Sequence, residues 1–330
     1  MYDCMLLEQV LDKYGLPVVE YSIISNKEKK KVWKVKFSGG SAALKKMPGT
    51  PEKTFFLARS VDFLAGVGVK VAPVIPTAEG SLFVNIKKDT FLLSRWIDGK
   101  QPDYDRNLEL ILESMARFHL GSRGFQPGEG YIRSHLGTWL ESFAKKKKKL
   151  EQLKEIAHEN YRDSFSRIFL QFVDHFIESV ALAEKKLVKS CYRDWIKRLK
   201  KELCLCHQDF TPKNLRLSAG ELYVFDIDSI TVDLPARDIR KIINKLMKKK
   251  GWDKVLLNQV SNLYRKNNPI SDSEWQVVLI DLYFPHLFWG IVTKYYGKRA
   301  PDWPKEKFLK RLDEMVKVEL SKEKILADLI

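Results

Sequence analysis

One short segment combines the residue types that phosphoryl transfer needs. Residues 207–214 read HQDFTPKN, a His-x-Asp-x4-Asn pattern, and Asp226 follows twelve residues later at the end of an apolar run. In kinase-type chemistry an Asp deprotonates the acceptor hydroxyl, an Asn five residues later holds a metal ion, and an Asp on the next strand bridges metals and phosphates. The spacing predicts Asp209 as the base, with Asn214 and Asp226 as ligands of Mg²⁺, which prefers carboxylate and amide oxygens.

A lysine far upstream is a second, independent feature of this kind. Kinase chemistry uses a lysine on the third strand of a small sheet to bind the α- and β-phosphates of ATP. Ala43-Leu44-Lys45 has the required Ala-x-Lys spacing. Alone, Lys45 would be interpreted as a solvated strand residue, and it becomes a candidate ligand only beside the Asp and Asn set. Ser94 and Trp96, where the fifth predicted strand ends, would then lead into the hinge that reads the adenine edge.

Hydrophobic periodicity predicts the elements that position these residues. Alternating patterns bounded by turn residues predict strands at 18–24, 32–37, 42–47, 81–86 and 90–96. Helices are predicted at 6–14 and from Pro51 to about Gly66, and helical periodicity dominates from Asp105 onward. A short interlude of strands, at 203–206 and 222–226, interrupts these helices and carries the candidate catalytic residues.

Composition excludes several classes of protein. The 330 residues include 58 Lys+Arg and 42 Asp+Glu, a formal charge of +16, so anions are the expected partners. The basic runs, Lys145–Lys149 among them, accompany no nucleic-acid-binding motif and are interpreted as solvated faces, which makes nucleic acid an improbable partner. Four cysteines are too few for a disulfide scaffold. No signal peptide and no stretch near the roughly 20 apolar residues of a membrane span is recognised, which predicts a protein made on the cytosolic side.

Longer patterns connect the sequence to a known group of proteins. The strand order, the HQD triplet and the tail Asp233-x-Pro235-x-x-Asp238-Ile239 resemble the aminoglycoside phosphotransferase and choline kinase-like superfamily. The segments 116–119 (ARFH) and 283–289 (YFPHLFW) are similar to the CotS family of bacterial spore-coat proteins. The resemblance implies that Asp238 buttresses the catalytic loop from a helix.

The resemblance also implies a fold and a function. The expected fold is α+β and protein-kinase-like, with a small antiparallel N-lobe at 1–98 and a mainly helical C-lobe at 99–330 that carries the catalytic loop 207–214 and a metal-binding strand 222–228. The expected activity is transfer of a phosphoryl group from ATP, with Mg²⁺, to a hydroxyl of a small molecule or coat component. The protein would be made in the mother-cell cytoplasm and deposited in the spore coat among acidic coat proteins, with no membrane partner.

Several positions depart from the kinase pattern or leave their role open. No G-x-G-x-x-G lies between the first two strands, where Ser25-Asn26-Lys27-Glu28 forms the turn. Glu52, in the first turn of the helix from Pro51, is the only Glu there that could pair with Lys45. Arg216 stands where many kinases have an apolar floor for adenine. These features favour the alternative of a kinase-shaped structural coat protein with little or no activity, whereas the intact Asp209, Asn214 and Asp226 favour the enzyme.

Two further residues near the motif are assigned supporting roles. His207 is predicted to pack and hydrogen-bond so that the catalytic turn keeps its shape, rather than to transfer protons. Asp228 lies two residues after Asp226, so its side chain would point the same way if the strand continued. It is therefore either a further metal ligand or a supporting residue.

Overall fold

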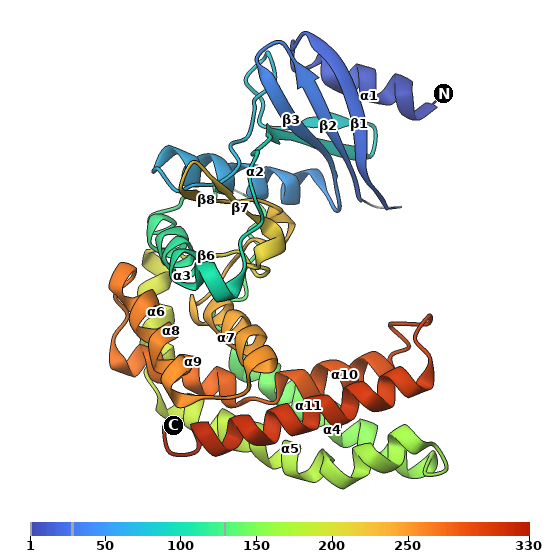
Figure 1. Cartoon of the computed structure of the whole chain (residues 1–330), viewed down its shortest axis with the longest axis vertical. Helices are drawn as coiled ribbons and strands as arrows, with labels where there is room; N and C mark the ends of the chain where they lie inside the picture. Colours follow the sequence, from blue (N-terminus) through green and yellow to red (C-terminus); the bar gives the residue numbers. More distant parts are fainter. Residues whose placement is uncertain (1, 28–29, 129) are drawn as a thin grey trace. The chain divides into compact units, whose positions relative to one another are not determined.

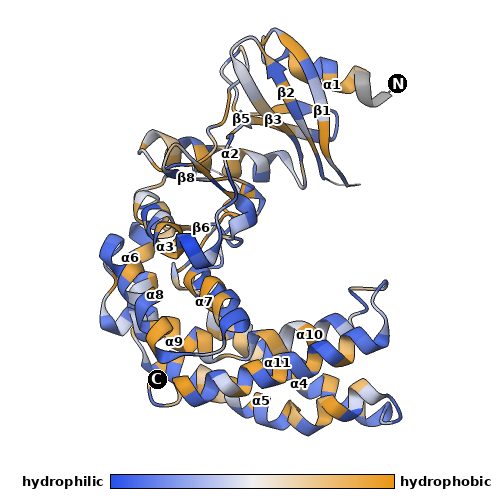
Figure 2. Ribbon diagram, in the orientation of Figure 1, coloured by the Kyte–Doolittle hydropathy of each residue, from blue (hydrophilic) through white to orange (hydrophobic). Residues whose placement is uncertain are grey.

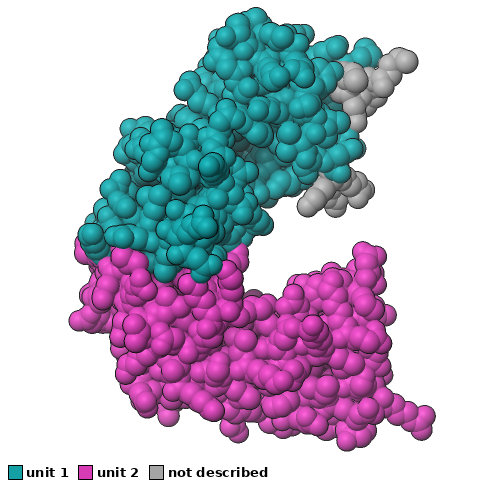
Figure 3. Space-filling model, in the orientation of Figure 1, with its two compact units in different colours: residues 1–134, 201–235, 266–268 teal, residues 135–200, 236–265, 269–330 magenta. Residues whose placement is uncertain are grey.

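The computed structural model describes residues 2–27, 30–128 and 130–330. The contacts divide the chain into two compact units (Figure 3). Unit 1 contains residues 1–134, 201–235 and 266–268, and unit 2 contains residues 135–200, 236–265 and 269–330. The predicted lobes at 1–98 and 99–330 stay a prediction. Glu28, part of the predicted turn without glycine, lies outside the described residues.

Unit 1 contains the five-stranded antiparallel sheet, as predicted (Figure 1). The strands are β1 (Val18–Lys27), β2 (Lys30–Phe37), β3 (Gly40–Met47), β4 (Val84–Ile86) and β5 (Asp89–Arg95), in the spatial order β1-β2-β3-β5-β4. In this register Lys45 pairs with Val32 on one side and with Leu92 on the other. Residues that pair directly across an antiparallel sheet share a face, so the three side chains point to the same side.

Two helices cover this sheet. From α1 (Tyr2–Asp12), Leu7, Val10 and Leu11 pack into a buried cluster with sheet residues such as Val35 and Leu93. Helix α2 (Pro51–Gly66) begins where predicted, because the Thr50 side chain accepts a hydrogen bond from the Lys53 amide and Pro51 occupies the first helical position. The Oγ1 atoms of Thr54 and Thr90, 3.0 Å apart, connect α2 to β5.

The rest of unit 1 carries the motif residues. Its elements are α3 (Tyr104–Gly121), the pair β6 (Leu205–Cys206) and β9 (Thr231–Val232), the hairpin β7 (Leu215–Ser218) and β8 (Glu221–Val224), and the 3₁₀ turns η1 (Pro212–Asn214) and η2 (Ile227–Ser229). Strand β8 ends at Val224, so the predicted strand 222–228 stops before Asp226. Backbone hydrogen bonds from Ala72 N to Val224 O and from Val224 N to Lys70 O attach β8 to residues 70–72.

Unit 2 is helical. Its helices are α4 (Trp139–Glu159), α5 (Ser164–Lys189), α6 (Tyr192–Lys201), α7 (Ala236–Lys250), α8 (Lys254–Asn267, up to residue 265), α9 (Asp272–Tyr283), α10 (His286–Tyr296) and α11 (Lys305–Leu326). In Figure 2 these helices carry both hydrophobic and hydrophilic residues along their length. In the core, Phe169 of α5 stacks on Phe288 of α10, and Phe176 of α5 packs against Phe288 at a tilt. In the lysine run, Lys145 is solvated as predicted, whereas Lys146 is half-buried over the Phe284 ring.

One segment corrects the expectation that no stretch approaches a membrane span. Among the described residues, Asp272–Tyr296 is long and apolar enough by length and composition. However, 67% of its apolar window is buried inside the fold, as it would be in a core helix, and the segment consists of two helices, α9 and α10, separated at Pro285. It is therefore weak support for a span.

Candidate active site

The turn after β6 is held in place by a buried histidine. The His207 Nε2 atom lies 3.0 Å from the Phe225 carbonyl oxygen, and its Nδ1 atom accepts a hydrogen bond from the Asp209 amide at 3.3 Å. A ring that accepts at Nδ1 must donate from Nε2, so this geometry requires the neutral imidazole. The rings of Phe118 and Phe210 meet His207 edge-on. The ring therefore connects the catalytic turn to the chain just before Asp226.

The predicted base and the predicted amide ligand lie side by side. The Nδ2 atom of Asn214, in η1, donates to the Asp209 Oδ2 atom at 3.0 Å and to the Asp209 carbonyl at 2.9 Å. Lys213 Nζ lies 2.8 Å from the same carboxylate oxygen. These contacts fix the Asp209 carboxylate, whose side chain keeps about a third of its surface exposed.

Tyr104, at the start of α3, is a neighbour of Asp209 that the sequence did not indicate. Its hydroxyl is buried and, among the described residues, has no hydrogen-bond partner. Burial raises the pKa of Tyr104, and the Asp209 charge raises it further. A neutral hydroxyl near this carboxylate can donate a hydrogen bond to an incoming oxygen.

Lys45 pairs with two carboxylates at once. Its Nζ atom lies 2.6 Å from Asp226 Oδ1 and 2.5 Å from Asp228 Oδ1. Asp226 adopts a left-handed conformation with φ of 62°, and η2 follows it, so Asp228 faces the same lysine although β8 does not continue. Burial raises the pKa of Asp226, but the charges of Lys45 and Lys30 outweigh it and hold that pKa well below its usual range. The Asp226 carboxylate is therefore ionised at neutral pH.

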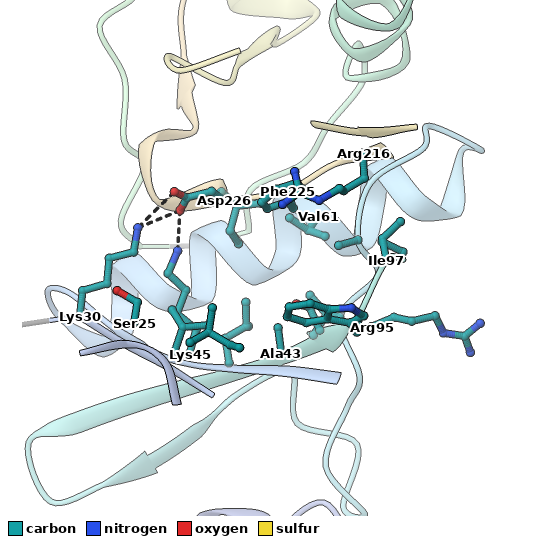
Figure 4. A pocket seen from close by; sticks show the side chains of 18 residues that line it. Ser25, Lys30, Ala43, Lys45, Val61, Arg95, Ile97, Arg216, Phe225 and Asp226 are labelled. Atoms are coloured by element: carbon teal, nitrogen blue, oxygen red, sulfur yellow. Dashed lines mark hydrogen bonds and ion pairs between the residues drawn. The ribbon is translucent and has the colours of Figure 1, made fainter. Parts of the chain in front are cut away.

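A second lysine, missed by sequence reasoning, joins this cluster. Lys30, the first residue of β2, places Nζ 3.0 Å from Asp226 Oδ1 and 2.9 Å from Asp228 Oδ2. In Figure 4, Lys30 and Lys45 approach Asp226 from the same side of the site. The only sequence signal was the basic run around Lys30, which does not say which lysine faces the sheet interior. The pairing register would have shown it, because Lys30 and Val32 share a face with Lys45.

Glu52 does not take the place that a kinase helix gives to its glutamate. Its side chain is exposed in the first turn of α2, and within the described ranges no ion pair connects it to Lys45. The next residue, Lys53, is a cation instead, and burial together with the Arg133 charge lowers its pKa. Arg133 donates to the Asp228 carbonyl oxygen at 2.7 Å. Cations thus surround Asp226 and Asp228, and both Lys53 and Arg133 were missed.

A cavity of about 370 Å³ adjoins this cluster. Its apolar walls come from the sheet, from α2 and from segments outside the strands: Val32, Ala43, Val61, Ala72, Val74, Leu92, Ile97 and Phe225. Lys30, Lys45 and Asp226 lie at one end, and Arg216 lies at the other, with its guanidinium 4.9 Å from the Phe225 ring centroid (Figure 4). A slot with an apolar body and a charged end can hold a planar base at one end and phosphates at the other.

The hinge residues line this cavity but differ in what their backbone offers. Ser94 and Trp96 both line it, as predicted for contacts with a base. The Trp96 amide, however, donates to Ser41 O at 3.0 Å, and the Arg95 amide donates to Pro73 O at 2.8 Å. In the part of the chain that the structure describes, the Ile97 amide has no such partner. Of these hinge residues, Ile97, which carries no sequence signal, is therefore the one whose amide is available to a ligand in the cavity.

The donor set suits a hard divalent cation. Asp226 and Asp228 supply carboxylate oxygens. Asn214 supplies an amide oxygen, while its Nδ2 donates two hydrogen bonds to Asp209. Oxygen donors of this kind are the ligands that Mg²⁺ prefers. Asp238 is buried in the first turn of α7, and its predicted role as a buttress of the catalytic loop stays a prediction.

Comparison with known sequences points to spore coat proteins. Residues 46–329 match the family model described as "Spore coat putative kinase YutH". The chain is 31% identical over 325 residues to Spore coat protein S of Bacillus subtilis (strain 168), a match that covers 97% of this chain and 93% of that protein. The resemblance to the CotS family, identified from the motifs, is confirmed.

Comparison with solved structures identifies the fold. An aminoglycoside phosphotransferase from Alicyclobacillus acidocaldarius is similar with a TM-score of 0.80 and 18% identity, covering 98% of this chain and 94% of the other. Spectinomycin phosphotransferase in complex with ADP and spectinomycin has a TM-score of 0.63 at 14% identity, covering 97% and 98%. Amicoumacin kinase in complex with AMP-PNP and Ca²⁺ has a TM-score of 0.59 at 13% identity, covering 99% and 93%. The predicted kinase-like α+β fold is confirmed.

Proposed function

Because the chain belongs to the family of kinase-like bacterial spore coat proteins, we propose that it is an active phosphotransferase of the aminoglycoside phosphotransferase type. It uses ATP and Mg²⁺ to phosphorylate a hydroxyl group on a small molecule or a coat component. The observation that carries this proposal is the ion pair between Lys45 Nζ and Asp226 Oδ1, 2.6 Å long, at the end of an apolar cavity of about 370 Å³. The ADP and AMP-PNP complexes of the structural neighbours support the choice of nucleotide.

In the proposed reaction the protein mainly positions groups and stabilises charge. Asp209 accepts the proton of the acceptor hydroxyl while that oxygen attacks the terminal phosphorus of ATP. The bond from this phosphorus to the bridging oxygen breaks, and ADP leaves with the electron pair. Asn214 and Lys213, through their contacts with Asp209 Oδ2, orient the carboxylate. Lys45 binds the phosphates that remain on the nucleotide.

The metal ligands in this proposal are Asp226 and Asn214, with Asp228 as a further carboxylate. Divalent metal bound there would neutralise charge on the phosphates. The residues themselves are prepared for it, because the low pKa of Asp226 keeps its carboxylate ionised. His207 maintains the connection between the catalytic turn and Phe225, next to Asp226.

Nucleotide binding is tested by the melting temperature in titrations with ATP, ADP and GTP, with and without Mg²⁺. We expect metal-dependent stabilisation by ATP, of about 3 kcal/mol at a hundredfold excess over Kd, which is lost in Asp226→Ala. Asp194→Ala, on the exposed face of α6, is the matched control because it removes an exposed, ion-paired carboxylate of unit 2. The absence of any shift with any nucleotide would refute the proposal.

The role of Asp209 is tested by separating binding from turnover. Asp209→Ala should reduce ATP hydrolysis or acceptor phosphorylation by about 10²- to 10⁴-fold, because general base catalysis contributes that much, and it should leave nucleotide affinity largely unchanged. A variant that loses nucleotide binding instead would show that Asp209 has been misassigned.

A kinase-shaped coat protein without activity is the second candidate. Arg216 favours it, since a guanidinium packed on Phe225 lies at the base end of the cavity where an apolar floor would hold adenine. The variant Arg216→Leu distinguishes the two candidates. If the protein is an enzyme that tolerates the arginine, the substitution should change its nucleotide affinity only modestly. If the protein is inactive, neither the wild type nor Arg216→Leu should bind nucleotide.

Location and partners are part of the proposal. We expect synthesis in the mother-cell cytoplasm and deposition in the spore coat, where the charge of +16 favours acidic coat proteins as neighbours. Such contacts should weaken steeply as salt rises, because screening reduces the attraction between exposed charges. Extraction of spore coats and salt-dependent co-sedimentation with acidic coat fractions test both points.

A further inference from the structure

The turn between β1 and β2 cannot cradle phosphates in the way a glycine-rich loop does. Its sequence from Ser25 onward, SNKEK, contains no glycine. The two strands stay paired up to the positions Lys27 and Lys30, so the backbone on both sides of the turn belongs to the ladder. A protein that binds triphosphate here needs side chains in place of backbone amides.

The pairing register of β2 with β3 places the Lys30 side chain next to this turn, on the face that carries Lys45. It precedes Val32 by two residues, and Val32 pairs with Lys45, so Lys30 and Lys45 project from the same face of the sheet. Both ammonium groups contact both carboxylates, Asp226 and Asp228, and both line the cavity. Figure 4 shows Lys45 between Lys30 and the end of the cavity formed by Ile97 and Arg216. Lys30 therefore lies toward the terminal phosphates of a nucleotide whose base fills that end.

The balance of charges around Asp226 and Asp228 supports a phosphate-binding role for Lys30. The side chains of Asp226 and Asp228 are two carboxylates, and Lys30 and Lys45 contact both of them. Arg133 donates to the Asp228 carbonyl oxygen, and Lys53 interacts electrostatically with Asp228, so two further cations lie beside the pair. The cluster therefore has an excess of positive charge. Phosphate groups, each with about one to two negative charges at neutral pH, would balance it.

We infer that Lys30 is a second phosphate-binding lysine, which holds the phosphates beyond the α-phosphate and makes the site select its donor by the number of phosphates. This inference rests on the proposed function and adds to it the residue that replaces the glycine-rich turn. A charged hydrogen bond to a terminal phosphate exists only with di- and triphosphates, so the contribution of Lys30 should grow along the series from adenosine to ATP.

The test is calorimetric titration of Lys30→Met with adenosine, AMP, ADP, ATP and inorganic tripolyphosphate, each in EDTA and in Mg²⁺. The matched control is Lys31→Met, the neighbouring lysine whose side chain projects from the opposite face of β2. We expect Lys30→Met to weaken ATP binding by about 10- to 100-fold and ADP binding less. Adenosine and AMP affinities should stay within about twofold, and Lys31→Met should match the wild type throughout. Melting curves without ligand check that both variants fold.

The outcomes separate this inference from the proposed function. Equal losses for adenosine and ATP would mean that Lys30 only shapes the site, and unchanged ATP affinity would mean that it binds no phosphate; either result overturns the inference. If the wild type binds tripolyphosphate but no nucleotide, and Lys30→Met loses that binding, the inference holds while the choice of ATP fails. If the wild type binds neither, both fail.

Discussion

Two clusters of opposite charges in this chain have similar distances but different surroundings. In unit 1, Lys45 contacts Asp226 at 2.6 Å and lines a cavity, and Lys30 there is 31% exposed. In unit 2, Asp281 is 5% exposed, and its two oxygens receive Arg240 Nε at 2.9 Å and His286 Nε2 at 3.0 Å. The first cluster has more cations than carboxylates and lines a cavity. In the second cluster, both oxygens of the Asp281 carboxylate are paired with cationic or hydrogen-bonding side chains.

The difference separates binding from architecture. The Asp281 cluster connects α7, α9 and the start of α10, and a second sealed pair, Glu319 and Lys322 of α11, contacts the same junction. Glu319 accepts from the Leu287 amide, and Lys322 donates to the Phe284 carbonyl. Buried pairs of this kind fix a unique arrangement and leave no charge for a ligand. Closely spaced opposite charges thus occur in both regions. The feature that distinguishes the candidate binding site in unit 1 is an excess of positive charge beside a cavity.

The largest expected effect comes from Asp226→Asn, which should reduce turnover by at least about 10³-fold, or about 4 kcal/mol in activation free energy. The amide keeps the shape but removes the charge that a metal and Lys45 require. Stability should change little, because Asp228 still compensates both lysines and the cluster is accessible to water. Steady-state kinetics and urea unfolding measure the two quantities. Retained turnover would place the chemistry elsewhere.

The corresponding variant in unit 2 is Asp281→Asn. It should lower the free energy of unfolding and leave nucleotide binding in unit 1 unchanged. It leaves Arg240 buried without its charge partner, and breaking such a pair costs about 3–5 kcal/mol of unfolding free energy. ATP affinity, measured where the variant is still folded, should remain unchanged. Asp313→Asn is the control, since its exposed pair with Lys317 should contribute about 0.5 kcal/mol or less. Similar losses in both variants would remove the distinction between the clusters.

The sequence predicted local features of unit 1 well. The neighbouring strands predicted at 32–37 and 42–47, and the helix start at Pro51, depend on residues close together in the chain. Lys45 was found because its spacing is fixed within one strand.

What the sequence could not give depends on long-range register and on unusual backbone. Lys30 reaches Asp226 across 196 positions, and only the pairing of β2 with β3 decides that it, rather than Lys31, faces the site. The left-handed Asp226 ends the strand early and turns Asp228 back to Lys45, which no alternation of residues predicts. Arg133, which donates to the Asp228 carbonyl oxygen, lies in a loop that contains no recognisable motif.

A smaller effect is expected for pH, through His286. Burial, and then the Arg240 charge, lower the pKa of His286 well below its usual value. Because the folded-state pKa is lower than the unfolded one, the stabilisation is present above about pH 6.5 and is lost as the pH falls below it. Urea unfolding between pH 7.5 and pH 5 should show a fall of about 1–2 kcal/mol in the wild type.

Two variants test whether His286 causes that fall. His286→Gln should flatten the profile, whereas His158→Gln, on the exposed face of α4, should leave it unchanged. A His286→Gln profile parallel to that of the wild type would mean that His286 does not cause the fall. A steeper fall in His286→Gln would mean that the imidazole is already charged beside Asp281, so that the unit 2 cluster carries an excess of positive charge as the unit 1 cluster does.

The smallest effect is expected from a substitution of Glu52. This substitution tests which carboxylates pair with Lys45 during the reaction. In a kinase with a glutamate partner, removing that glutamate displaces the lysine and impairs phosphate binding. Here Asp226 and Asp228 hold Lys45 from the hairpin side, while Glu52 is exposed in the first turn of α2. Glu52→Gln should therefore leave ATP affinity and turnover within about twofold of the wild type, the range expected for a surface substitution. A clear loss of ATP affinity or turnover would mean that α2 moves Glu52 into the site during the reaction, and that Lys45 then pairs with it.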